Sequence, residues 1–229
     1  MVNNTELIVM LTHNDQTVEN AYEIFKQCKK TKVKYWGLKE KGLPLDQMKK
    51  LYDYMKECNK TTVLEAVAYT EEKCIEGAKI AVECGCDILM GTVFFDSVNE
   101  ICKENNLIYM PFVGEITGRP SILKGNIDEM IDAARKYIEK GVYGIDLLGY
   151  RYIGNAVSLI KKFVSQMNAP VCIAGSINSY KKLDEIMDCG AWAFTIGGAF
   201  FENIFGGTYN KQIEKVYEYI NARKTIAFQ

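Results

Sequence analysis

The sequence holds a single histidine, His13, and no two of its eight cysteines form a Cys-x-x-Cys pair. We therefore expect no metal ion held by cysteine and histidine, and no disulfide framework in a chain of 229 residues. No apolar run reaches the roughly 20 residues of a membrane span. The short apolar stretch near the N-terminus has no basic segment before it, so a signal peptide is not expected either.

A strong charge of either sign is also absent, because 28 basic residues stand against 29 acidic ones and the net charge is −1. Without a basic surface, nucleic acids and anionic membranes are not expected partners. The composition itself, 48% hydrophobic and 25% charged, is ordinary for a globular protein with one sizeable core. We expect a cytoplasmic protein, and whether it forms a homodimer stays open.

Short apolar runs recur along the chain and alternate with segments in which apolar residues repeat at helical spacing. The runs predict strands at residues 6–12, 32–38, 62–67, 87–91, 107–113, 142–148, 170–174 and 192–196. Asn126 and Ser179 stand where two helices should begin, as N-capping residues do. Glycines stand just beyond three of the predicted helices, as residues that terminate helices do, at Gly85, Gly141 and Gly190.

Apolar strands that alternate with helices are typical of a parallel sheet covered by helices on its outer face. Eight such units match a closed barrel, and we predict that residues 1–229 form one (β/α)8 TIM barrel domain. The alternative is an open doubly wound sheet. No Gly-x-Gly-x-x-Gly motif opens the first helix, however, as the dinucleotide-binding form of that fold requires.

Two short glycine motifs follow the last two predicted strands, Gly175-Ser176 and Gly197-Gly198. In a parallel barrel the carboxyl ends of all strands open onto one face, and that face carries the site. A phosphate group needs several converging backbone N–H donors, and glycine lets the backbone come close to it. A short helix predicted after Gly198 would aim its first amides at the same place. The motifs therefore predict a phosphate site, although tight turns alone would also explain these glycines.

The stretches "IAGSINS" and "CGAWAFTIGGAFF" resemble the phosphate-binding part of the ribulose-phosphate-binding barrel superfamily. The resemblance implies phosphate contacts by four residues, Gly175, Ser176, Gly197 and Gly198. That superfamily includes phosphosugar isomerases, epimerases, decarboxylases and aldolases. Two of its signatures are missing here: an Asp-x-Lys-x-x-Asp motif on a middle strand, and the histidine and aspartate metal set of the phosphopentose epimerases. The resemblance therefore leaves the reaction open.

Three charged residues stand inside or at the end of apolar strands, namely Lys39, Glu65 and Asp146. A carboxylate in such a strand is costly unless it has a partner, so we expect the three to converge in the barrel mouth. Because side chains alternate along a strand, one register turns Lys39 into the mouth and Glu40 outward, and the opposite register reverses this.

The convergence of a lysine with two carboxylates admits more than one role. A neutral lysine could form a Schiff base with a carbonyl substrate while Glu65 and Asp146 move protons, as in a class I aldolase. The ammonium form of Lys39 could instead stabilise an enolate, as an isomerase or epimerase requires. An internal ion pair that braces the barrel is the structural alternative.

Other polar residues lie in predicted loops on the same face. His13 follows the first strand, Glu115 and Arg119 lie in a long glycine-containing loop that we expect to act as a mobile flap, and Arg151 follows the sixth strand. Each is a candidate substrate contact.

These observations predict a metal-independent enzyme that acts on a small phosphorylated carbonyl metabolite, with an aldolase- or decarboxylase-type lyase ahead of an isomerase or epimerase. We expect no cofactor. Two alternatives stay open: a non-catalytic protein that binds a phosphorylated metabolite, and a barrel in which the phosphate belongs to FMN.

Overall fold

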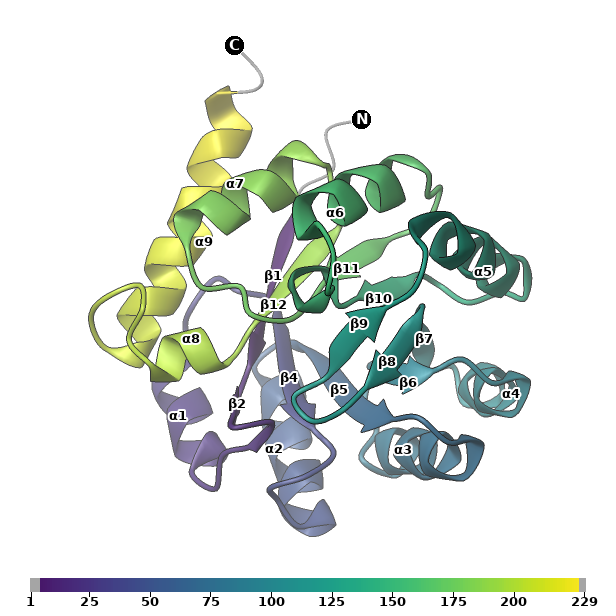
Figure 1. Cartoon of the computed structure of the whole chain (residues 1–229). Coiled ribbons are helices and arrows are strands. Elements are labelled where there is room, and N and C mark those ends of the chain that lie inside the picture. The colour runs from purple at the N-terminus through teal and green to yellow at the C-terminus, as the bar shows by residue number, and fades with distance from the viewer. Residues whose placement is uncertain (1–4, 227–229) are drawn as a thin grey trace.

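Parallel strands close into a barrel in the computed structural model, which describes residues 5–226 and their side chains up to residue 223 (Figure 1). In chain order the barrel strands are β1 (Glu6–Met10), β4 (Tyr35–Lys39), β5 (Thr61–Ala68), β6 (Ile88–Val93), β7 (Ile108–Phe112), β10 (Ile145–Leu147), β11 (Val171–Ile173) and β12 (Ala193–Ile196). The first strand pairs with the last, with Leu7 opposite Phe194, and also with β4. The predicted (β/α)8 barrel is therefore confirmed, and the open doubly wound sheet is excluded.

Helices cover the outside of the barrel (Figure 1). They are α1 (Ala21–Cys28), α2 (Leu45–Glu57), α3 (Glu71–Glu83), α4 (Asp96–Glu104), α5 (Ile127–Glu139), α6 (Ala156–Ser165), α7 (Tyr180–Asp188) and α9 (Tyr209–Ile226). The predicted N-caps form, since the Asn126 side chain accepts from the amide of Asp128 and the Ser179 hydroxyl accepts from that of Lys182. Within residues 5–226, no helix combines the length and apolar composition that crossing a membrane requires.

The interior of the barrel is apolar, whereas its mouth, at the carboxyl ends of the strands, is polar. A compact apolar cluster fills the interior, made of Ile8, Met10, Val63, Ile88, Met90, Met110, Cys172 and Ala193. A second and larger cluster lies between the strands and the helices. There Gly77 of α3 packs so closely on β5 that an added Cβ would lie 2.7 Å from the Cβ of Ala66. This packing holds the strands rigidly, so their carboxyl ends present side chains in fixed positions.

Two small hairpins stand at the carboxyl ends of the strands. The first pairs β2 (Thr12–His13) with β3 (Gln16–Thr17), and the second pairs β8 (Glu115–Thr117) with β9 (Ile122–Lys124). The second occupies the segment predicted to be a flap. Its tip is held in place, because the Tyr69 hydroxyl donates to the carbonyl of Gly118 at 2.8 Å.

Candidate functional site

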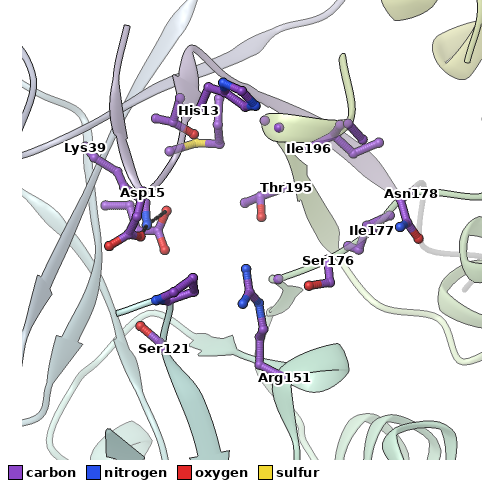
Figure 2. Close-up of a pocket in the computed structure, with 18 of the residues that line it drawn as sticks. His13, Asp15, Lys39, Ser121, Arg151, Ser176, Ile177, Asn178, Thr195 and Ile196 are labelled. Atoms are coloured by element: carbon purple, nitrogen blue, oxygen red, sulfur yellow. Dashed lines mark hydrogen bonds and ion pairs between the residues drawn. The ribbon is translucent and has the colours of Figure 1, made fainter. Parts of the chain in front are cut away.

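A cavity of about 350 Å³ opens at the carboxyl ends of the strands, between the two hairpins (Figure 2). Residues after β1, β11 and β12 line it together with the side chains of Lys39, Glu65 and Arg151. Figure 2 shows Lys39 and Asp15 on one side and Ser176 and Asn178 on the other. The cavity thus has two chemically different ends, one formed by backbone and Arg151 and one formed by charged side chains.

The loops after β11 and β12 meet at the first of these ends. All four residues predicted to contact phosphate line the cavity: Gly175, Ser176, Gly197 and Gly198. Gly175 and Ser176 have positive φ values of 85° and 55°, which turns the chain sharply after β11. Gly197 precedes the short helix α8 (Gly198–Phe201), which stands where the sequence predicts an extra helix.

Backbone amides at this end are free to bind a ligand. Within residues 5–226, no protein group accepts a hydrogen bond from the amides of Ser176, Gly198 or Ala199. Gly198 is half-buried and Ala199 is buried, whereas Ser176 is exposed. Three amides that lie beside one cavity and have no partner in the described part of the chain are suited to an anion.

Arg151 supplies the positive charge at the same end. It closes the short 3-10 helix η1 (Gly149–Arg151) after β10, and its side chain points into the cavity (Figure 2). No carboxylate among the described side chains forms an ion pair with it. It packs on Gly175, where an added Cβ would lie 2.5 Å from Arg151 Cγ. Its guanidinium is therefore available for an anionic ligand.

Lys39 lies at the opposite end, buried at the end of β4 and paired with Asp15 and Glu65. Asp15 belongs to the β2–β3 turn, in which Asn14 and Asp15 have φ values of 50° and 61°. Two positive φ values in a two-residue loop are typical of a type I′ hairpin turn. The turn brings the Asp15 carboxylate onto the Lys39 ammonium, while the Oε2 atom of Glu65 lies 3.7 Å from Lys39 Nζ.

These carboxylates decide the protonation state of Lys39. Burial lowers the pKa of Lys39, but Glu65 and Asp15 outweigh burial, and the net pKa lies above its ordinary value. Burial in turn raises the pKa of Glu65, and Lys39 offsets part of that rise. Lys39 is therefore an ammonium group at neutral pH, paired with one carboxylate from the β2–β3 turn and one from β5.

Asp146 lies below the floor of the cavity. It pairs in register with Cys172, which belongs to the interior cluster, and it is 1% exposed. Among the described residues neither of its carboxyl oxygens has a hydrogen-bond partner. Burial raises the pKa of Asp146 well above its ordinary value, and nearby Glu65 raises it further. Burial therefore favours the neutral carboxylic acid form of Asp146 over the carboxylate.

Arg119 ties the β8–β9 hairpin across the mouth. Its guanidinium bonds the Asp15 carboxylate at 3.1 Å and also the carboxylate of Glu40 and the carbonyl of Val67. Strand alternation left open whether Lys39 or Glu40 points into the mouth. Lys39 lines the cavity and Glu40 does not. The Glu40 side chain is nevertheless only 13% exposed, because Arg119 and the amide of Val67 hold it.

The other two candidate contacts are placed differently. His13 lines the cavity beside Glu202, with 3.7 Å between Nε2 and Oε1, and stacks on Phe201. Glu115 is exposed at the base of the hairpin and does not line the cavity. Arg119 lies near the site but reaches it through Asp15 and Glu40. The hairpin residues that do line the cavity are its neighbours Pro120 and Ser121.

Several lining residues were not predicted as site residues. Thr195 and Asp15 are the most central of them. Thr195 is a polar residue inside the apolar strand β12, which is the same signal that identified Glu65. Asp15 was visible only as a polar residue after the first strand, because its contact with Lys39 depends on the backbone of the turn. No cluster of three or more potential metal ligands occurs among the described residues.

The sequence matches no protein-family model and no curated protein. Solved structures do resemble the chain. Orotidine 5′-monophosphate decarboxylase from Methanocaldococcus jannaschii has a TM-score of 0.69 at 14% identity, covering 96% of this chain and 99% of the other. N-acetylmannosamine-6-phosphate 2-epimerase from Clostridium perfringens has a TM-score of 0.64 at 14% identity, covering 95% and 93%.

A regulatory protein also shares the fold. The glycerol uptake operon antiterminator regulatory protein from Listeria monocytogenes has a TM-score of 0.56 at 16% identity, covering 84% of this chain and 91% of the other. At such identities the likeness concerns the fold. The resemblance to the ribulose-phosphate-binding barrels is confirmed at that level.

Proposed function

We propose that this chain is an enzyme that acts on a small phosphorylated carbonyl compound, with the phosphate at the Arg151 end and the carbonyl at the Lys39 end. The main support for the proposal is that one cavity contains both an anion site and a charged reactive site. Backbone amides and an arginine that have no partner among the described residues form one end. An ammonium group between two carboxylates forms the other. Perturbed charged groups that share a cavity with an anion site are typical of active sites.

The phosphate would bind to the loops after β11 and β12. The amides of Ser176, Gly198 and Ala199 donate to its oxygens, and Arg151 neutralises its charge. The phosphate then fixes the rest of the molecule along the cavity. This orientation places the carbonyl group near Lys39 and removes much of the entropic cost of reaching the reactive geometry.

At the carbonyl end, Lys39 acts as an ammonium electrophile. The ionised form of Glu65 takes a proton from the carbon next to the carbonyl. The electron pair of that C–H bond forms the C=C bond of the enolate, and the π pair of the carbonyl moves onto its oxygen. Lys39 stabilises the oxyanion as it forms. The proton on Glu65 then returns to carbon. Asp146, whose pKa is raised by burial, would hold a second proton near the same site.

The enolate is common to two reaction classes. We propose a lyase of the aldolase or decarboxylase type. In an aldolase, ionised Glu65 takes the proton of a hydroxyl group on the second carbon from the carbonyl, the bond between the first and second carbons breaks to release an aldehyde and the enolate, and Glu65 returns the proton to the enolate carbon. In a decarboxylase, a carboxylate on the carbon next to the carbonyl leaves as CO2, and a proton from water quenches the enolate. An isomerase or epimerase is the second candidate. The raised pKa of Lys39 favours that candidate over a Schiff-base enzyme, because enolisation needs only the ammonium form.

Proton exchange tests the proposal without knowledge of the natural substrate. Phosphorylated aldoses and ketoses of three to six carbons are incubated with the protein in D2O, and NMR follows deuterium uptake beside the carbonyl. We expect exchange with at least one compound, and a loss of at least about 100-fold in Lys39→Met and Glu65→Gln. Lys50→Met, which changes an exposed lysine paired with Asp46, is the control and should exchange normally.

The remaining outcomes separate the alternatives. Borohydride reduction that leaves a covalent adduct on Lys39 would replace the ammonium role with a Schiff base. Phosphate binding without exchange on any compound would indicate a binding protein rather than an enzyme.

A further inference from the structure

The two ends of the cavity differ in charge, and this difference bears on which phosphorylated compounds fit. At the Lys39 end three carboxylates, those of Asp15, Glu40 and Glu65, surround two cations, Lys39 and Arg119. The positive charge there is already consumed by these ion pairs. At the other end Arg151 has no carboxylate partner among the described side chains.

Because these charged groups are largely buried, the difference in charge between the two ends acts strongly on a ligand. The side chains of Asp15 and Glu65 are 17% and 13% exposed, so bulk water screens them poorly. Asp146 is also buried, and neither of its carboxyl oxygens has a hydrogen-bond partner among the described residues. It supplies no positive charge for a second anion. A ligand carboxylate at this end would lie against Asp15 and Glu65 and would find only one ammonium group, which those two residues already share.

A neutral oxygen fits the same place. The Lys39 ammonium has three N–H groups, and Asp15 accepts from one of them. A carbonyl or hydroxyl oxygen of the ligand can accept from another. A ligand hydroxyl can also donate to Glu65 or Asp15, which accept but cannot donate when ionised. The end formed by Lys39 therefore complements a group that both donates and accepts.

We propose that the cavity selects phosphate monoesters whose far end is neutral and carries hydroxyl or carbonyl groups, and that it rejects those whose far end is a carboxylate. The substrate class would be sugar or polyol monophosphates rather than phosphorylated sugar acids. Within the proposed lyase class this selectivity fits an aldolase and not a decarboxylase, whose substrate carries a carboxylate next to the carbonyl. This inference rests on the phosphate end described under the proposed function, and it names Glu65 and Asp15 as the residues that set the specificity.

A matched pair of ligands tests it. Erythritol 4-phosphate and 4-phosphoerythronate share the phosphate and both secondary hydroxyls, and they differ only in a terminal CH2OH or carboxylate. Calorimetric titration of the full chain at neutral pH should give at least about tenfold tighter binding of erythritol 4-phosphate. Glu65→Gln should reduce this ratio by about tenfold, because one of the repelling charges is gone.

The control is Glu202→Gln, which removes a carboxylate that lines the cavity on the His13 side. It should increase the affinity for both ligands by the same factor and leave the ratio of the two affinities unchanged. Equal or tighter binding of 4-phosphoerythronate by the unmodified protein would overturn the selectivity while leaving the phosphate end intact. Failure of both ligands to bind would overturn the phosphate end and the selectivity together. Selective binding with no proton exchange on any carbonyl compound would support the selectivity and count against the enzymatic function alone.

Discussion

Asp146 shows how a single residue can couple the barrel interior to pH. In the unfolded chain its carboxyl group has a pKa near 3.8, whereas burial raises this pKa in the folded protein and favours the protonated form. The folded state therefore binds one more proton above that pH. As a result, Asp146 makes the free energy of unfolding fall by about 1.4 kcal/mol per pH unit until the raised pKa is passed.

Asp146→Asn removes this titration. We expect the free energy of unfolding of the variant, relative to the unmodified protein, to increase as the pH rises above 4, and to level off once the raised pKa of Asp146 is passed. Urea denaturation at several pH values measures the difference. A difference that does not change with pH would mean that Asp146 ionises normally in the folded state.

Gly175 has a left-handed backbone conformation and packs directly on Arg151, the proposed phosphate ligand. Its φ is +85°, and an added Cβ would press on Arg151. Gly190 is a matched control, because its φ is +74° and an added Cβ there would meet nothing within 4 Å. Both Gly175→Ala and Gly190→Ala should lose about 1 kcal/mol of stability from the left-handed backbone.

Only Gly175→Ala should also weaken phosphate binding, by about tenfold, because Arg151 must move. Thermal unfolding gives the stabilities and calorimetric titration with inorganic phosphate gives the affinities. Equal phosphate affinities of the two variants would show that Arg151 does not take part in binding.

The β8–β9 hairpin is the element that closes one side of the mouth. Arg119 at its tip bonds to Asp15 and Glu40, which belong to two other segments of the chain. Arg119→Ala leaves both carboxylates without this partner, and such groups are costly when half-buried. We expect amide hydrogen exchange in the hairpin and in the β2–β3 turn to increase by about tenfold or more.

The control for this element is Arg135→Ala, which removes an exposed i,i+3 ion pair with Asp132 on α5. It should leave exchange in both hairpins unchanged. If Arg119→Ala also left the exchange rates unchanged, the hairpin would be held by its strand pairing and by Tyr69 alone.

Elements that depend on periodicity were predictable, and elements that depend on turn geometry were not. The barrel strands and the caps at Asn126 and Ser179 follow from local patterns in the sequence. Strand alternation allowed two registers for Lys39 and Glu40, and the structure places Lys39 in the cavity. The contacts of Glu40 could not be predicted, because Arg119, which holds its side chain, lies 79 residues away in the sequence.

The same distinction applies to the site. Glu65, Thr195 and Asp146 can be recognised from the sequence as polar residues in apolar strands. Asp15 cannot, because its position next to Lys39 depends on the type I′ turn at Asn14 and Asp15. The long loop predicted to be a mobile flap forms a hairpin, and the contacts of Tyr69 and Arg119 that fix it join distant segments.

At the scale of the whole molecule, the closed barrel brings residues from both halves of the chain to one face. Lys39 and Glu65 come from early strands, and the anion-binding loops come from the last two. Proteins with this fold include a decarboxylase, an epimerase and a regulatory protein, so the fold alone does not determine the chemistry. The proposed function therefore rests on the residues of the cavity, whose two ends differ in charge.

The central claim is that backbone amides after β11 and β12 bind a phosphate group together with Arg151. Titration of the isotopically labelled protein with inorganic phosphate, followed by amide NMR shifts, tests it most directly. We expect saturable shifts centred on Ser176, Gly198 and Ala199, and a phosphate affinity at least about tenfold weaker in Arg151→Ala. Shifts that are absent from these three amides, or that survive unchanged in Arg151→Ala, would contradict it.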